Sequence, residues 1–178
     1  MKAINFFSAL LLTATLFTAC KKDKIEHKSD FDKSYKAWLN FKATSGNSYT
    51  YQVSTSSWTN FQTFTMITVT NGKITSRSYT ARSTSQPPSA AVTIHEEWIE
   101  DQSTLNSHEM GAAALTLDEI YDRAKTVWLK KRSDADFYFE TKNNGMISSC
   151  GFVPDGCQDD CFTGITIDFI RKPGEPGF

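Results

Sequence analysis

The densest group of reactive side chains lies in one loop near the end of the chain. This loop carries three cysteines, Cys150, Cys157 and Cys161, and three carboxylates, Asp155, Asp159 and Asp160. Closely spaced cysteines indicate a disulfide if the chain is exported, which the N-terminal features described below predict, and any pairing of three leaves one thiol over. Loop entropy separates Cys150–Cys157 from Cys150–Cys161 by only about 0.3 kcal/mol. Geometry favours Cys150–Cys161, because these residues lie where the flanking strands leave and re-enter the sheet.

Metal binding by this loop is a weaker interpretation. Zinc requires four ligands, and the loop has neither a neighbouring histidine nor a paired Cys-x-x-Cys motif. Calcium prefers six or more oxygen ligands, but the carboxylate spacing is not that of an EF-hand loop. The weak candidates for calcium ligands are Asp155, Asp159 and Asp160. A disulfide-linked surface loop with solvated acids accounts for the same residues, so we expect no metal or cofactor.

Catalysis is not favoured by the remaining motifs. A thiol nucleophile needs a nearby base, and outside the N-terminal tether only His95 and His108 are available. The chain contains no Gly-x-Ser-x-Gly, P-loop or His-Glu-x-x-His sequence, and capping explains the adjacent acids Asp118 and Glu119. The aromatic residues Trp58 and Tyr79 would suit a ligand platform, although sheet core is the simpler interpretation. No catalytic residue is therefore predicted.

Periodicity places helices and strands around this loop. Apolar residues at helical spacing predict a first helix that Asp30 caps and that ends near Gly46. A Thr116–Glu119 capping box begins a second helix, whose apolar stripe is Ile120, Ala124, Val127 and Trp128. Period-two patterns and turn residues predict strands at 49–54, 61–70, 73–81 and 165–169. A further strand starts at Phe137, turns at Asn143-Asn144-Gly145 and resumes at Met146, and residues 92–99 fit a strand better than the alternative helix. The sum is an α+β domain: an antiparallel sheet of five to six strands, an N-terminal helix, and a second helix packed on the sheet.

The N-terminus has the features of a lipoprotein signal peptide. Lys2 precedes an apolar run at 6–17, which is too short to span a membrane, and small residues precede Cys20 as in a lipobox. Acyl chains such as palmitate on Cys20 would anchor the protein to a membrane. The predicted division is a signal peptide at 1–19, a tether at 20–29, one domain at 30–171 and a frayed tail at 172–178. An outer-membrane location is expected by analogy because Lys21, and not Asp, follows the cysteine.

The balance of charged side chains indicates which classes of binding partner the protein can be expected to have. The chain has 19 basic and 20 acidic side chains, for a formal net charge of −1. This balance lacks the basic excess of nucleic-acid-binding proteins, so no nucleic acid partner is expected. The expected partners are the membrane, through covalent lipid, and a protein of the envelope.

Several motifs together resemble an uncharacterised family of small Bacteroidota-type lipoproteins. They are the Tyr49-Thr50-Tyr51 strand, the Leu115–Asp122 helix start, the Asn-Asn-Gly turn and the Cys157–Cys161 loop. Many members carry a Gly-Tyr-Pro turn where this chain has the cysteine loop, so their hairpin detail does not transfer. The resemblance implies fold and compartment but no chemistry.

The resulting functional hypothesis is a lipid-anchored envelope domain, non-enzymatic, that binds a protein or small ligand through its sheet or cysteine loop. One alternative is a calcium-dependent protein or envelope enzyme that uses the Asp155–Cys161 loop. Another is a protein inhibitor, since small α+β domains with disulfide-linked loops often serve that role.

Overall fold

The computed structural model describes residues 25–86, 88–159 and 161–175, and within them seven strands form one antiparallel sheet. The strand order is β4-β3-β2-β1-β7-β6-β5. The strands are β1 (Tyr49–Ser56), β2 (Phe61–Thr70), β3 (Lys73–Thr84), β4 (Val92–Asp101), β5 (Ala135–Glu140), β6 (Ser149–Pro154) and β7 (Thr163–Arg171). The chain therefore makes a four-strand meander, then a helical segment, then a three-strand meander whose last strand returns beside β1.

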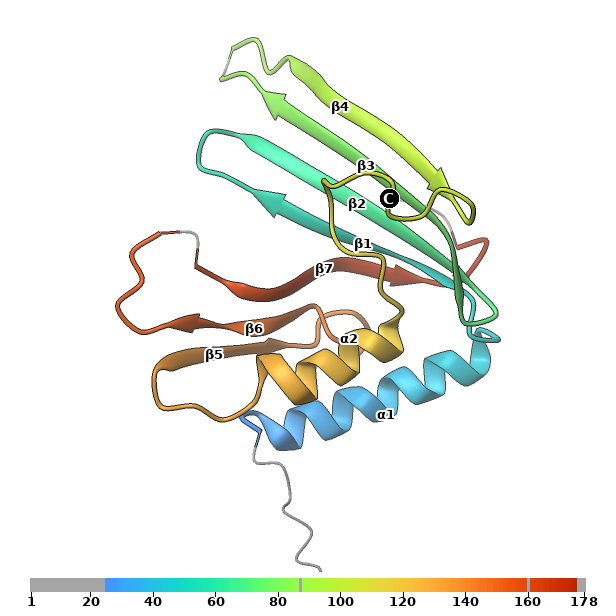
Figure 1. Cartoon of the computed structure of the whole chain (residues 1–178), viewed down its shortest axis with the longest axis vertical. Coiled ribbons are helices and arrows are strands. Elements are labelled where there is room, and N and C mark those ends of the chain that lie inside the picture. The colour runs from blue at the N-terminus through green and yellow to red at the C-terminus, as the bar shows by residue number, and fades with distance from the viewer. Residues whose placement is uncertain (1–24, 87, 160, 176–178) are drawn as a thin grey trace, which may run out of the picture.

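Helices cover only part of one face of this sheet (Figure 1). They are α1 (Lys28–Thr44), α2 (Leu117–Arg123) and a π-helical turn, η1 (Ala124–Trp128). The loop between β4 and α2 crosses the same face in front of β2 and β3, and none of the described helices lies on the opposite face (Figure 1). The helix-covered side holds the core, and we refer to the other side as the open face.

The α+β class is confirmed, but the predicted number of five to six strands is too low. The predicted turn at Asn143–Gly145 is present between β5 and β6, and the buried Met146 and Ile147 follow it before β6 begins. Strand β6 runs from Ser149 to Pro154 and so occupies the first part of the predicted cysteine loop, residues 150–162. Glycine and proline are depleted in strands, and Gly151 and Pro154 concealed this one.

The folded chain begins earlier than the sequence indicated. Ile25 forms an isolated antiparallel bridge with Lys130, and the Glu26 amide donates to the Leu129 carbonyl at 2.8 Å. Helix α1 then starts at Lys28, so Asp30 lies in its first turn and does not cap it. Residues 25–29 of the predicted tether are thus part of the domain. The predicted signal peptide, Cys20 and the rest of the tether lie outside the described residues.

The second helix begins as predicted and ends differently. The Thr116 hydroxyl accepts from the Glu119 amide, and the Glu119 carboxylate accepts from the Thr116 amide, which confirms the capping box. From Ala124 the helix widens into η1, where the Leu129 amide donates to the Ala124 carbonyl. The extra residue in this turn buries both Trp128 and Leu129, and it leaves Val127 exposed instead of in the apolar stripe.

Two tyrosines attach the start of α2 to the sheet. Tyr49 and Tyr51 both point into the core, and their hydroxyls bond the Leu117 amide at 2.8 Å and the Leu115 carbonyl at 2.5 Å. Burial raises the pKa of both phenols well above the ordinary value. On α1, the buried Trp38 donates its Nε1–H to Asp118 Oδ1 at 3.0 Å. These bonds satisfy polar atoms that burial would otherwise leave unpaired.

Candidate functional site

The cysteine loop contains a disulfide, although not the favoured one. Cys157 and Cys161 are joined, with their Cα atoms 6.2 Å apart, and Cys150 is a free, buried thiol. The preference for Cys150–Cys161 is wrong because Cys150 points from β6 into the core under the helices. Cys157 and Cys161 lie beyond the strand ends, in the loop. Strand β6 includes Cys150, so this residue is not at the end of the sheet where the pairing argument placed it.

Burial removes the nucleophilic character of Cys150. Its surroundings are apolar, and this burial raises the pKa of the Cys150 thiol to about 12. A thiol with so high a pKa is almost entirely protonated at neutral pH, and the thiolate is the nucleophile. Cys150 therefore acts as a core residue.

A thiol titration should show this division directly. In the mature chain with Cys20→Ser, under non-reducing conditions, we expect no reactive thiol in the folded protein and one after unfolding in guanidinium chloride. The folded protein should show no reactive thiol because Cys150 is buried, and the unfolded chain should show only one because Cys157 and Cys161 are bonded to each other. Three thiols in the unfolded chain would contradict the disulfide, and one fast thiol in the folded protein would contradict the burial.

The structure gives no support for a metal site in the part of the chain that it describes. No group of three or more His, Cys, Asp or Glu side chains within that part could hold an ion. Of the weak calcium candidates, Asp155 and Asp159 lie on the exposed loop, and Asp160 is outside the described residues.

A buried ion pair that sequence reasoning missed joins β3 to β4. Arg77 donates through Nε and Nη2 to the two carboxylate oxygens of Glu100, both at 2.8 Å, and both side chains are almost fully buried. The Glu100 carboxylate also accepts from the amides of Asn106 and His108, at 2.9 and 2.8 Å. Arg77, with these amides, holds the pKa of Glu100 well below its usual range. The sequence did contain a signal, because Arg77 alternates with the inward-facing Tyr79 and Ala81.

This network holds the loop that crosses the sheet. Arg77 also donates to the carbonyls of His108 and Ala112, so together with the Asn106 and His108 amides four bonds of the network end on the backbone of that loop. The His108 ring stacks on Trp98 at 4.3 Å between centroids, and its Nδ1 lies 3.1 Å from Glu100. Among the described residues no serine or cysteine contacts His108 Nε2. The carboxylate–imidazole pair thus has a structural role that its contacts explain.

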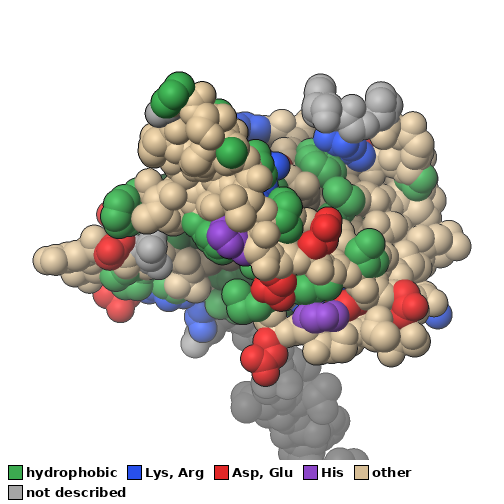
Figure 2. Space-filling model, turned by 90° about the horizontal axis from the view of Figure 1, so that it is seen from above, with side chains coloured by type: hydrophobic (Ala, Val, Ile, Leu, Met, Phe, Trp, Pro, Cys, Tyr) green, Lys and Arg blue, Asp and Glu red, His purple; other side chains and the backbone are tan. Residues whose placement is uncertain are grey.

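The expected aromatic platform is not formed by the residues named for it. Trp58 is 90% exposed on the β1–β2 turn, and Tyr79 is buried against Trp98. His95 bonds Ser83 at 2.8 Å on an exposed part of β4, in agreement with a sheet-surface position. Figure 2 views the molecule from above Figure 1 and shows hydrophobic side chains as small separate patches among polar ones. That surface has no continuous apolar platform.

A different aromatic pair lies on the open face, where the cysteine loop returns to the sheet. Alternation along β5 turns Phe137 and Phe139 toward the helices and Tyr138 toward the open face. Phe162, directly after the disulfide, packs edge-on against Tyr138 at 6.3 Å between centroids. The two rings remain 48% and 40% exposed. Large aromatic side chains held in place but left half-exposed are the usual anchors of binding surfaces.

Two glycines make room for the Phe162 ring. Gly151 and Gly164 pair across β6 and β7 beneath it. A Cβ at Gly151 would lie 2.6 Å from Phe162 Cζ, and one at Gly164 would lie 2.9 Å from the same atom. Neither glycine has a positive φ, so both are needed for space and not for backbone conformation. The ring therefore rests directly on the sheet backbone.

The Tyr138–Phe162 pair borders a groove of about 470 Å³. The groove runs from the open face around the free edge of β5, and its lining mixes apolar and polar groups. The lining residues are His27, Phe137, Tyr138, Phe139, Glu140, Ser149, Val153, Phe162 and Thr166. We call this the Tyr138–Phe162 groove.

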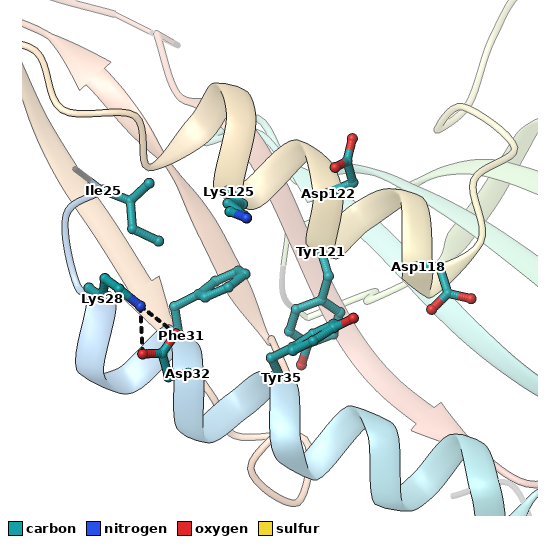
Figure 3. A pocket seen from close by; sticks show the side chains of 9 residues that line it. All are labelled: Ile25, Lys28, Phe31, Asp32, Tyr35, Asp118, Tyr121, Asp122 and Lys125. Carbon is teal, nitrogen blue, oxygen red and sulfur yellow. Dashed lines mark hydrogen bonds and ion pairs between the residues drawn. The ribbon is translucent and has the colours of Figure 1, made fainter. Parts of the chain in front are cut away.

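A second, smaller groove of about 300 Å³ separates α1 from α2 (Figure 3). Its floor is aromatic, formed by Phe31, Tyr35 and Tyr121. The Tyr121 hydroxyl is already bonded to Ser34 at 2.7 Å, and Lys28 pairs with Asp32 at 2.7 Å. Because these polar groups satisfy one another, this groove offers a ligand less than the Tyr138–Phe162 groove does.

Comparison with known proteins does not assign this site. No family model, curated protein or solved structure matches the chain. The resemblance to small envelope lipoproteins therefore stays a prediction from the sequence. No helix in the described ranges 25–86, 88–159 and 161–175 is long and apolar enough to cross a membrane.

Proposed function

We propose that the protein is a lipid-anchored binding domain of the bacterial envelope, and that it binds an extended segment of a partner protein in the Tyr138–Phe162 groove. The observation that carries this proposal is the pair of half-exposed aromatic rings beside a strand edge that no other described strand covers. The lipid anchor rests on the sequence around Cys20.

The strand edge favours an extended peptide over a small ligand. The Glu140 carbonyl accepts from the Ser148 amide and the Asp134 carbonyl from the Asp155 amide, so even-numbered residues of this strand face β6. The backbone groups of Ala135, Phe137 and Phe139 therefore point outward. His27 Nε2 lies 3.3 Å from the Phe137 carbonyl oxygen, so a peptide bound at this position would replace that contact. A peptide that adds to such an edge gains main-chain hydrogen bonds and places alternate side chains in pockets.

The groove would supply the specificity. If the bound peptide adds to the sheet as a strand, every second side chain of the peptide would project on the open face, next to Tyr138 and Phe162. Burial of an aromatic or long aliphatic side chain there would contribute about 1.5–3 kcal/mol. The predicted ligand is thus an extended peptide with at least one large apolar side chain.

Selection from a random peptide display library tests this proposal. With the mature Cys20→Ser chain as bait, we expect enriched peptides to share a large apolar residue. Tyr138→Ala should weaken their binding about 10- to 30-fold, the loss typical of an aromatic anchor. Trp58→Ala removes an even more exposed aromatic ring that does not line the groove and should leave binding unchanged. Peptides that bind Tyr138→Ala as tightly as wild type would contradict the proposal.

A further inference from the structure

The basic side chains near α2 gather around the point where the folded chain begins. Ile25 pairs with Lys130, and Glu26 forms an ion pair with Lys131 at 3.4 Å. Figure 3 shows Ile25 near Lys28 of α1 and Lys125 of η1, at one end of the groove between the helices. Lys28, Lys125, Lys130 and Lys131 thus form one surface, which we call the basic end.

Part of this charge is not neutralised within the domain. Lys28 and Lys131 pair with Asp32 and Glu26, but Lys125 and Lys130 form no ion pair with any described residue. Lys130 and Lys131 follow the C-terminal end of η1, where the helix dipole favours cations. Lys28 is the first residue of α1, where the dipole disfavours them. The helix dipole therefore does not explain the whole cluster.

The far side of the molecule has the opposite charge. Residues 92–116, which contain β4 and the loop after it, include no lysine or arginine. Outside the Arg77–Glu100 pair, their carboxylates are Glu96, Glu97, Asp101 and Glu109. Strand β4 is the sheet edge farthest from β5 in the strand order, and Figure 1 shows it at the end of the molecule opposite α1. Lysines therefore gather at the basic end of the molecule, and carboxylates gather at the β4 end.

The short connection to Cys20 brings the basic end to the membrane. Five residue steps separate Cys20 from Ile25, and a fully extended chain of that length spans at most about 18 Å. Within the domain, Lys28 is the cation closest to the anchor along the chain, and Lys130 pairs with Ile25, the first described residue. Each basic side chain close to an anionic membrane surface strengthens attachment about fivefold.

We propose that the basic end seats the domain on anionic lipid headgroups of the membrane that anchors it, with the β4 edge directed away. This inference rests on the proposed lipid anchor at Cys20. The acyl chains would only tether the domain, whereas the basic end would also fix its orientation by holding one side of it against the bilayer.

Lysine-specific labelling of a tethered protein tests this orientation. The unlipidated mature chain is coupled through the Cys20 thiol to maleimide-lipid in vesicles; Cys150 is buried and the other two cysteines are bonded, so they do not compete. One vesicle set contains phosphatidylglycerol with phosphatidylethanolamine, and the other contains phosphatidylcholine. Acetylation rates at each lysine are then read by mass spectrometry.

On the phosphatidylglycerol vesicles, we expect acetylation of Lys125 and Lys130 to slow about fivefold or more relative to phosphatidylcholine, and molar salt to restore it. Lys73 is the internal control. It lies beyond the other end of the 17-residue α1, where the Gly72 amide bonds the Asn47 carbonyl, roughly 25 Å away. Its rate should not change.

Equal rates on both vesicle types would overturn the inference, as would slowing at Lys73 in place of Lys125. The maleimide supplies the anchor, so these results do not depend on whether the cell acylates Cys20. The intact mass of the native protein tests acylation separately.

Discussion

Glu100→Ala is expected to lower the free energy of unfolding by about 3–5 kcal/mol, because it leaves the Arg77 guanidinium buried without a counter-charge. It also removes the acceptor of the Asn106 and His108 amides, so the loop between β4 and α2 should lose protection first. Urea denaturation gives the total loss, and amide hydrogen exchange shows where it occurs.

Two controls separate the ion pair from ordinary strand effects. Glu97→Ala, at an exposed position of the same strand, should change stability by less than about 0.5 kcal/mol. The double variant Arg77→Met/Glu100→Leu buries no charge and should lose less than Glu100→Ala alone. If Glu100→Ala were as stable as wild type, the Arg77–Glu100 pair would not hold the loop.

The Arg77–Glu100 pair also makes the free energy of unfolding depend on pH in the acid range. Folding lowers the pKa of Glu100, so in acid the unfolded chain binds more protons than the folded chain. The contribution of Glu100 is fully present above the ordinary carboxylate value of about 4.3 and is lost as pH falls through the lower folded value. The stability difference between wild type and Glu100→Gln should therefore shrink below about pH 4.

Gly164→Ala is expected to cost about 1–3 kcal/mol of stability and to abolish peptide binding in the Tyr138–Phe162 groove. The new Cβ would overlap the Cys150 carbonyl oxygen and lie 2.6 Å from Gly151 Cα, so β6 and β7 would have to separate. It would also displace the Phe162 ring that rests on both glycines. Thermal melting and the peptide-binding assay measure the two effects.

Phe162→Ala distinguishes the causes of that loss. This variant removes the ring without a backbone overlap, so it should lose binding while it retains most of the stability. The double variant Gly164→Ala/Phe162→Ala should stay nearly as unstable as Gly164→Ala, because the overlap with Cys150 persists. Full recovery of stability in the double variant would show that the ring alone had caused the strain.

Local signals predicted much of the fold because they depend on neighbouring residues. The Thr116–Glu119 capping box and the Asn71-Gly72 turn lie within a few residues of what they determine, and the structure has both. Strand β4 was also predicted, although Glu96 breaks its pattern. An irregular register between β3 and β4 near Ala81 accounts for that break.

The missed features depend on contacts that no short window contains. Burial of Cys150 in the core follows from the position of β6 beneath the helices, so spacing alone suggested the wrong disulfide. The pairing of Arg77 with Glu100 spans 23 residues and needs the β3–β4 register. Phe162 was assigned to a loop, and only the facing glycines on two strands show why it rests on the sheet.

The proposed groove and the proposed membrane seat meet near the start of the folded chain. His27 lines the groove and lies two residues after Ile25, which pairs with Lys130. The groove opens on the face without helices, and the basic end includes residues of both helical segments. A bound peptide and the bilayer would therefore approach the domain from different sides.

Photo-cross-linking from position 138 tests the central claim most directly. In cells that make the full-length protein, Tyr138 is replaced by the photo-reactive analogue p-benzoylphenylalanine, and a second strain carries it in place of Trp58. We predict one discrete cross-linked protein from position 138, absent from position 58 and lost when Phe162→Ala is added. No product from position 138, or the same product from both positions, would contradict a binding site in the Tyr138–Phe162 groove.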